Sequence, residues 1–96
     1  MSVEIRKVGV VGCGTMGSGI CEVVARSGFD VRFAEMSEEA ERAGRERIER
    51  SVGRAVKREK LRQEDAETLL RHISSTTDLA DLGDCDLVFE AVPEKL

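Results

Sequence analysis

Three glycines near the start of the chain constrain its fold more than any other feature. Gly12, Gly14 and Gly17 form the pattern G-x-G-x-x-G directly after an apolar run, residues 8–11, in which three of the four residues are Val. β-branched residues of this kind favour a short buried strand. After the glycines, apolar side chains recur at the helical spacing i, i+4, i+7 and i+8, at Met16, Ile20, Val23 and Val24. We therefore predict a strand, a tight turn and a helix with these four side chains on its buried face.

Each glycine of the turn has its own chemical reason. Gly12 lets the chain leave the strand through backbone angles closed to side chains. The missing Cβ of Gly14 lets a pyrophosphate approach the backbone, and Gly17 lets the helix pack closely on the strand. The unpaired N–H groups of Thr15, Met16 and Gly17 lie at the positive end of the predicted helix and favour phosphate. The pattern predicts a dinucleotide site; the alternative is a turn that is glycine-rich for steric reasons alone.

An acidic residue at a suitable distance supports the dinucleotide interpretation. Glu35 ends the second predicted strand, residues 31–34, and lies 21 positions after Gly14. A carboxylate there accepts hydrogen bonds from both ribose hydroxyls and repels a 2′-phosphate, which favours NAD over NADP. The alternative is a solvated acid next to a helix start. Arg32 precedes Glu35 and is not interpreted as a clamp for NADP, although a charge within a buried strand is unexpected.

Composition excludes several classes of protein. The 96 residues suffice for one small domain, and the net charge of −4 argues against a main role in nucleic-acid binding. We find no apolar run of membrane length and no signal peptide, and expect a cytoplasmic protein. Cys13, Cys21 and Cys85 lack metal-ligand spacing, so no metal site is predicted. We interpret them as small buried residues in a reducing compartment, the alternative being a redox-sensitive thiol at the cofactor site.

A long charged helical hairpin is predicted between the second and third strands. Gly28 ends the first helix, and Ser37 caps the second, whose first turn is acidic. Its apolar stripe is narrow and consists of Ala40, Ala43, Gly44, Ile48, Val52, Ala55 and Val56. Its basic end suits the negative helix pole, with phosphate binding as the alternative. Residues 63–72 form the third predicted helix, and His72 is interpreted as a helix-end residue, not a catalytic base.

The remaining residues predict two more strands. Residues 73–77 form a short polar strand, residues 78–84 a turn or short helix, and residues 86–92 an apolar fourth strand. No linker or internal repeat separates these elements.

Taken together, the sequence resembles the amino-terminal part of the NAD-dependent 3-hydroxyacyl-CoA dehydrogenase family. The resemblance rests on the glycine segment, residues 8–20, on the charged hairpin, on Thr76-Thr77-Asp78-Leu79 and on residues 86–94. It implies an α/β, Rossmann-type parallel sheet with strand order 3-2-1-4 and the hairpin between strands 2 and 3. It also implies that residues 1–96 are an incomplete NAD-binding domain, without the carboxy-terminal domain that carries the catalytic residues and dimerises.

The resemblance also implies roles for individual residues. NAD would bind over Gly12, Gly14 and Gly17, with Glu35 on the ribose, where most relatives have Asp. Ala91 and Glu94 match positions near the cofactor. On the hairpin, Ser51 and Arg58 match positions that contact the CoA portion, and many relatives have Lys in place of Arg58.

The implied activity is oxidation of the 3-hydroxyl of a 3-hydroxyacyl-CoA to the 3-oxoacyl-CoA. No residue of this chain matches the family's catalytic base, so the chain alone is expected to be inactive. The alternatives are the cofactor domain of a β-hydroxyacid dehydrogenase and a non-catalytic NAD-binding or assembly module. We also expect the chain to self-associate, because the fourth predicted strand is apolar and has an unpaired edge. The association would use either edge pairing of this strand or exchange of a helix, for which the protruding hairpin is the favoured element.

Overall fold

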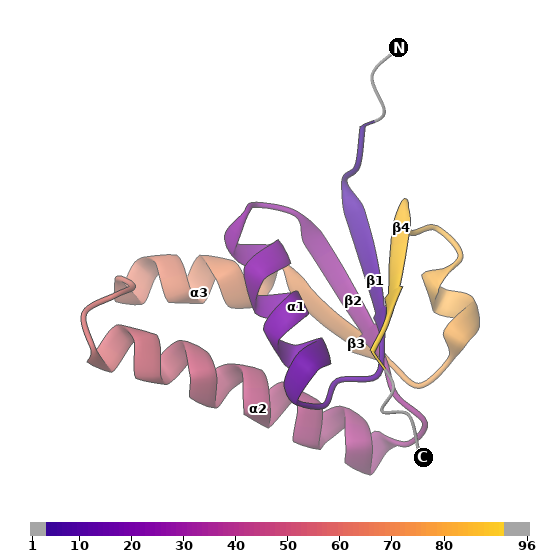
Figure 1. Cartoon of the computed structure of the whole chain (residues 1–96), viewed down its shortest axis with the longest axis horizontal. Coiled ribbons are helices and arrows are strands. Elements are labelled where there is room, and N and C mark those ends of the chain that lie inside the picture. Colours follow the sequence, from indigo (N-terminus) through magenta and orange to yellow (C-terminus); the bar gives the residue numbers. More distant parts are fainter. Residues whose placement is uncertain (1–3, 92–96) are drawn as a thin grey trace.

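The computed structural model of the chain describes residues 4–91. Its elements in chain order are β1 (Lys7–Val11), α1 (Thr15–Arg26), β2 (Asp30–Ala34), α2 (Glu38–Lys57), α3 (Gln63–Arg71), β3 (Ile73–Thr76), the 3₁₀ helix η1 (Leu79–Leu82) and β4 (Leu87–Glu90). The four strands are parallel and lie in the order β3-β2-β1-β4, and the α2–α3 hairpin extends to one side (Figure 1). Both the strand order and the inserted hairpin confirm the prediction.

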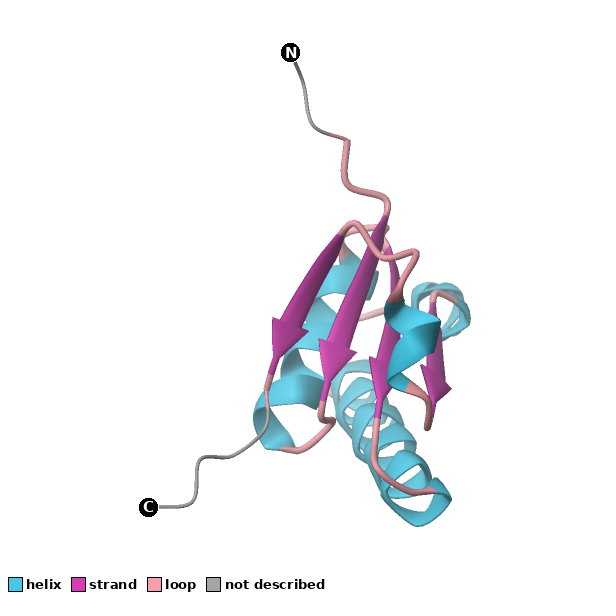
Figure 2. Cartoon of the chain, turned by 90° about the vertical axis from the view of Figure 1, so that its right-hand side faces the viewer, coloured by secondary structure: helices cyan, strands magenta, loops and turns pink. Residues whose placement is uncertain are grey.

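The sheet is covered unequally on its two faces. The three α-helices lie on one face, and η1 lies against the other (Figure 2). Val8, Val10, Val31 and Phe33 are buried in a core that also contains Ile48 of α2. Burying side chains of this size stabilises a fold by about 1.5–3 kcal/mol each. The core therefore lies between the sheet and its helical layer.

The thinner cover on the η1 face accounts for the charged residue in β2. Arg32 is half-buried, and its Nη1 donates to the carbonyl of Asp81 at 2.8 Å. The same guanidinium lies 3.7 Å from the carboxylate of Asp84. A strand on this face can hold an arginine because η1 and the following turn satisfy it.

β4 forms one edge of the sheet and pairs only with β1 among the described residues. The predicted strand began at Asp86, whereas β4 begins at Leu87, and the predicted end at Val92 lies outside the described residues. Leu87, Val88 and Phe89 remain 40%, 47% and 40% exposed. Its apolar side chains are thus less covered than those of the other strands.

The predicted buried face of the first helix is wrong. Met16 and Val23 are 61% and 65% exposed, whereas Ile20 and Val24 only flank the core. α1 packs on the sheet through smaller residues at i, i+4 and i+8, namely Gly17, Cys21 and Ala25. Small side chains allow a close approach between helix and strand, and this approach turns the larger side chains outward.

The hairpin forms largely as predicted. Ser37 caps α2 by accepting from the N–H of Ala40, and Gly28 has the left-handed conformation (φ 94°) expected after α1. Within the predicted apolar stripe, the residues that face the core are Gly44, Ile48 and Val52. Ala43 lies to one side of this line and is exposed. No helix within residues 4–91 combines the length and apolarity needed to cross a membrane.

His72 occupies the end of α3, as predicted. Its Nδ1 lies 2.8 Å from a carboxylate oxygen of Asp30 at the start of β2. This contact ties the hairpin to the amino-terminal end of the sheet.

Candidate functional site

The glycine turn between β1 and α1 has the geometry that its sequence predicts. Gly12 has φ 90°, and its N–H donates to the carbonyl of Ala34 at 2.9 Å, which holds the turn against the end of β2. A Cβ at Gly17 would lie 2.0 Å from the carbonyl oxygen of Gly12. Neither position tolerates a side chain, because Gly12 has a left-handed backbone and Gly17 packs closely against the turn.

Gly14 is a glycine for a different reason. Its φ is −76°, which any residue can adopt, and a Cβ there would meet no atom within 4 Å. It precedes α1 as a cap residue without a capping side chain. The described protein therefore does not require glycine here, and the space above Gly14 is open to a ligand.

Glu35 follows β2 and lies against the same turn. Its Oε2 accepts a hydrogen bond from the backbone N–H of Cys13 at 2.8 Å. The side chain is half-buried. The carboxylate is thus held in place by the glycine turn itself, a contact that the spacing of the residues alone did not reveal.

A hollow of about 570 Å³ lies at the carboxyl ends of the strands, and Glu35 and the glycine turn form part of its wall. The residues that line it are Val11, Gly12, Cys13, Gly14, Ala34, Glu35, Met36, Thr77, Leu79 and Ala91. The chain leaves β1 toward one sheet face and leaves β3 toward the other, so the hollow lies where the connections diverge (Figure 2). Ligands of open parallel sheets bind at such a point.

The other residues predicted at the cofactor site are distributed unevenly. Ala91 is buried and lines the hollow. Thr15 and Met16 are exposed in the first turn of α1, outside the lining of the hollow. Gly17 lies beneath the turn, and Glu94 lies outside the described residues.

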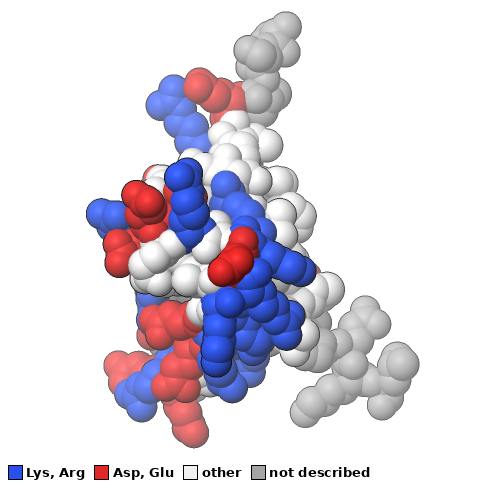
Figure 3. Space-filling model, turned by 90° about the vertical axis from the view of Figure 1, so that its left-hand side faces the viewer, with Lys and Arg blue, Asp and Glu red and all other residues white. Residues whose placement is uncertain are grey.

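The two residues predicted to contact CoA, Ser51 on α2 and Arg58 directly after its last residue, are not part of this hollow. Ser51 donates its hydroxyl hydrogen to Glu22 of α1 at 2.8 Å. Arg58 is exposed where α2 ends, together with Arg54, Lys57 and Lys60. Figure 3 shows basic side chains gathered on this side of the molecule. The site residues thus fall into one group at the turn and another along the hairpin.

Sequence reasoning missed one side chain at the turn. Arg47 of α2 donates from Nη1 to the carbonyl oxygen of Cys13 at 2.6 Å. The two residues are 34 positions apart, and Arg47 belongs to the charged run of a helix whose charged side chains were all expected in solvent. No local signal distinguishes it from neighbouring arginines.

Cys13 and Cys21 are fully buried free thiols, as the small-residue interpretation predicts, whereas Cys85 is only half-buried. A hydrogen bond with Cys21 lowers the pKa of Cys13, against the opposing effect of burial. The same bond and burial raise the pKa of Cys21. Within residues 4–91 no group of three or more His, Cys, Asp or Glu could hold a metal ion.

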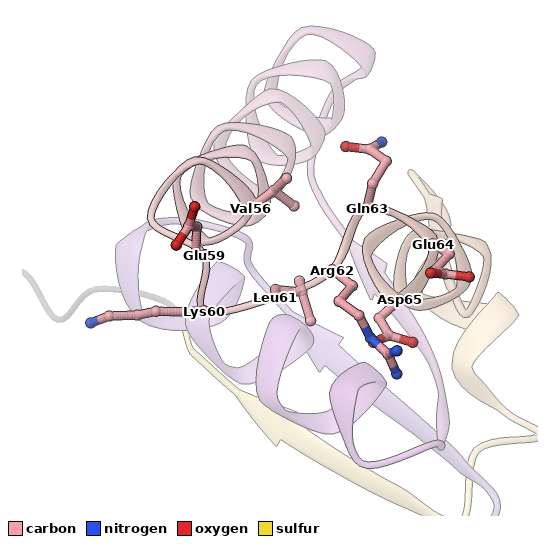
Figure 4. Close-up of a pocket in the computed structure, with 8 residues that line it drawn as sticks. All are labelled: Val56, Glu59, Lys60, Leu61, Arg62, Gln63, Glu64 and Asp65. Atoms are coloured by element: carbon pink, nitrogen blue, oxygen red, sulfur yellow. The ribbon is translucent and has the colours of Figure 1, made fainter.

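A second hollow, of about 480 Å³, lies at the turn between α2 and α3 (Figure 4). Val56 and Leu61 contribute its apolar surface, and most of the other side chains are charged. Arg62 and Asp65 point toward one another, with 3.2 Å between Nε and Oδ2. Because this hollow is far in sequence and structure from the glycine turn, we place the candidate site at the first hollow.

The fold, together with the hollow at the carboxyl ends of the strands, defines a Rossmann-type dinucleotide-binding domain. Residues 7–96 match the family described as "3-hydroxyacyl-CoA dehydrogenase, NAD binding domain", and the chain belongs to this family. The resemblance seen in the sequence is therefore confirmed.

Individual relatives agree with this assignment. A 3-hydroxybutyryl-CoA dehydrogenase of Mycobacterium tuberculosis is 49% identical over 94 residues, which cover 98% of this chain and 33% of the relative. The crystal structure of FadB2 from M. tuberculosis superposes with a TM-score of 0.94 at 47% identity, covering 97% of this chain and 33% of that one. For (S)-3-hydroxybutyryl-CoA dehydrogenase PaaH1 from Ralstonia eutropha the TM-score is 0.91 at 38% identity, with 97% and 33% covered. The chain spans about a third of the length of these relatives.

Proposed function

We propose that the chain binds NAD in the hollow at the carboxyl ends of the strands. The observation that carries the proposal is the open space above Gly14, where a Cβ would meet no atom within 4 Å. The N–H groups of Gly14, Thr15 and Met16 donate no hydrogen bond to another described residue, so they are free to bind the pyrophosphate. Gly12 and Gly17 shape the turn that presents them.

Glu35 is proposed to select NAD over NADP. Cys13 holds one carboxylate oxygen, and the half-buried group borders the hollow. A fixed carboxylate accepts from ribose hydroxyls and repels a 2′-phosphate. Ala91 would form part of the wall beside the cofactor, and Glu94 is proposed from the family resemblance alone.

We propose that the whole protein oxidises the 3-hydroxyl of a 3-hydroxyacyl-CoA to the 3-oxoacyl-CoA. NAD, when bound, accepts the hydride in this class of reaction. The residues of this chain would bind and orient it, and none of them is proposed as the base that takes the hydroxyl proton. The support is the family and the relatives, among them 3-hydroxybutyryl-CoA and 3-hydroxyadipyl-CoA dehydrogenases.

The acyl-CoA is proposed to contact the hairpin. Ser51 on α2 and Arg58, which caps the end of this helix, are seven residues apart, so they lie on the same side of the hairpin about two helical turns from each other. The exposed guanidinium of Arg58 stands among basic side chains that suit phosphate groups. Three free thiols support the cytoplasmic location that we also propose.

The substitution Gly14→Val tests the cofactor proposal. The Cβ of the valine would meet no atom of the described protein within 4 Å, and its methyl groups would extend into the space proposed for the pyrophosphate, so we expect the fold to persist while NAD binding is lost. Gly19→Val is the matched control, because a Cβ at Gly19 also meets no atom within 4 Å. Calorimetric titration with NAD measures binding, and circular dichroism monitors the fold. Normal NAD binding by the folded Gly14→Val variant would show that the turn is only structural.

Activity is tested separately. Dehydrogenation of 3-hydroxybutyryl-CoA is measured with this chain and with a longer version that continues past Leu96 to the relatives' length. We expect turnover only in the longer version. An inactive longer version that still binds NAD would favour the non-catalytic binding module.

A further inference from the structure

Three residues on one side of α2 contact the glycine turn and α1. Gly44, Arg47 and Ser51 follow each other at i, i+3 and i+7, which places them in one line along the helix. A Cβ at Gly44 would lie 2.8 Å from the Cβ of Cys13, so α2 and the turn approach closely. Ser51 bonds Glu22 of α1, and Arg47 bonds the Cys13 carbonyl between these two contacts. Figure 1 shows α2 passing the start of α1.

The contact of Arg47 controls one peptide group of the turn. In a planar trans peptide the C=O and N–H groups point in opposite directions. With the Cys13 carbonyl drawn 2.6 Å from Nη1 of Arg47, the N–H of Gly14 points away from α2. Glu35 holds the N–H of Cys13 on the preceding peptide. A side chain from α2 and one that directly follows β2 therefore set the orientation of consecutive peptides.

The positive charge of Arg47 also favours this orientation of the Cys13 carbonyl. No ion pair among the described residues includes Arg47, and the residue is half-buried. A carbonyl oxygen turned toward a pyrophosphate would repel it, whereas a carbonyl held by a cation is directed elsewhere. The Gly14 N–H makes no hydrogen bond within residues 4–91 and remains available as a donor.

We propose that Arg47 is a positioning residue for cofactor binding. It holds the peptide between Cys13 and Gly14 so that the Gly14 N–H faces the pyrophosphate, and it does not touch the cofactor itself. This role rests on the proposed binding of NAD over the glycine turn. It assigns a function in the cofactor site to the hairpin, a part of the chain outside the glycine motif.

The test compares two ligands that differ in the pyrophosphate. ADP contains it, and adenosine retains only the base and the ribose that Glu35 is proposed to bind. Arg47→Met should weaken binding of NAD and ADP by about tenfold and leave adenosine binding within about twofold of wild type, because the Cys13–Gly14 peptide must then be oriented on binding, at a cost of about one hydrogen bond. The affinities of Arg47→Lys for NAD and ADP should lie between those of wild type and Arg47→Met, because a point charge replaces the planar guanidinium. Arg50→Met is the matched control, an exposed arginine of the same helix.

A measurement without ligand separates this proposal from the cofactor proposal. In ¹H–¹⁵N spectra the Gly14 amide resonance should shift in Arg47→Met and stay in place in Arg50→Met. Absence of NAD binding in wild type would refute the proposed function and with it the role of Arg47 in cofactor binding, and the Gly14 resonance would then show only whether Arg47 holds the peptide. If Arg47→Met leaves both the Gly14 resonance and the ratio of ADP to adenosine affinity unchanged, the positioning role of Arg47 is refuted. If Arg47→Met fails to fold, the same affinity ratio and the same Gly14 resonance are measured in Arg47→Lys to test the proposal.

Discussion

The two carboxylate oxygens of Glu35 have different surroundings. Oε2 accepts from the N–H of Cys13, and the other oxygen accepts no hydrogen bond from the described residues. Replacing Glu35 by Ala removes both the tether on the turn and the proposed ribose acceptor. We expect NAD affinity to fall about tenfold, as loss of a charge-assisted hydrogen bond implies. NADP affinity should fall less, because the repulsion of its 2′-phosphate is also lost.

Titrating NAD and NADP into wild type and Glu35→Ala measures both effects. Glu35→Gln is the matched control, since it keeps the size of the side chain and removes its charge. Equal affinity of the wild type for the two cofactors would exclude Glu35 from cofactor selection.

Glu59 is the one described non-glycine residue with a positive φ, 58°, and it lies where α2 ends. Its N–H donates to the carbonyl of Val56, and the N–H of Lys60 donates to that of Ala55, so the left-handed residue closes the helix. A side chain in this conformation costs about 1–2 kcal/mol. Glu59→Gly should therefore raise the free energy of unfolding, by about 0.5–1 kcal/mol after the greater freedom of glycine in the unfolded chain is allowed for.

Urea denaturation checks this expectation. Lys60→Gly is the control, because Lys60 has no positive φ and glycine there should destabilise the hairpin. A lower unfolding midpoint for Glu59→Gly would contradict the interpretation of the helix end.

Among the elements, the pairing of β4 with β1 is reinforced by one carboxylate just before β4. Oδ2 of Asp86 accepts from the backbone N–H groups of Arg6 and Lys7 at 2.9 and 3.0 Å. These hydrogen bonds lower the pKa of Asp86 below its ordinary range. A carboxyl group with a lowered folded-state pKa stabilises the fold above its unfolded pKa, and this contribution disappears as the pH falls through the folded pKa.

The stabilisation from Asp86 should thus be complete at neutral pH and decline below about pH 4. Asp86→Asn should unfold more readily at pH 7 and lose less stability between pH 5 and 2 than wild type, which thermal unfolding across this range measures. Glu64→Gln serves as the control, since Glu64 is an exposed α3 residue without an ion pair among those described. Parallel pH curves for Asp86→Asn and wild type would show that the two backbone contacts carry no such stabilisation.

Local chemistry explains which elements could be predicted from sequence. The left-handed Gly28, the cap at Ser37 and the glycine turn each act within a few residues, and the structure has all three as expected. The face of α1 could not be predicted in this way. Periodicity ranks Met16 and Val23 as core residues, but the closest packing is achieved by Gly17 and its small neighbours, which turns both outward.

In the candidate site, too, some residues could be predicted from the sequence and others could not. The glycines and Glu35 could be found from their spacing, since the motif itself specifies a turn and a carboxylate. The contact between Arg47 and the Cys13 carbonyl depends on how the hairpin packs against the turn. Such long-range contacts leave no mark in the local pattern of a charged helix.

At the scale of the whole molecule, β4 leaves apolar surface uncovered. Leu87 and Phe89 are in register with Val8 and Val10, whose side chains are buried under the helices, yet both are 40% exposed. Val88 is in register with Gly9 on the opposite face and is 47% exposed. The outer edge of β4 pairs with no described strand. Unpaired strand edges flanked by apolar side chains bind further strands.

We therefore predict that this 96-residue chain self-associates through the edge of β4. Sedimentation velocity over a tenfold concentration range should show a rising weight-average mass. Val88→Lys should shift the chain toward monomer, because a lysine on an edge strand opposes pairing with a second copy. Ala43→Lys adds the same charge at an exposed position of α2 and should leave the association unchanged. A folded wild-type monomer at every concentration would refute the prediction, and equal association of both lysine variants would place the contact elsewhere, with exchange of the protruding hairpin as the next surface to test.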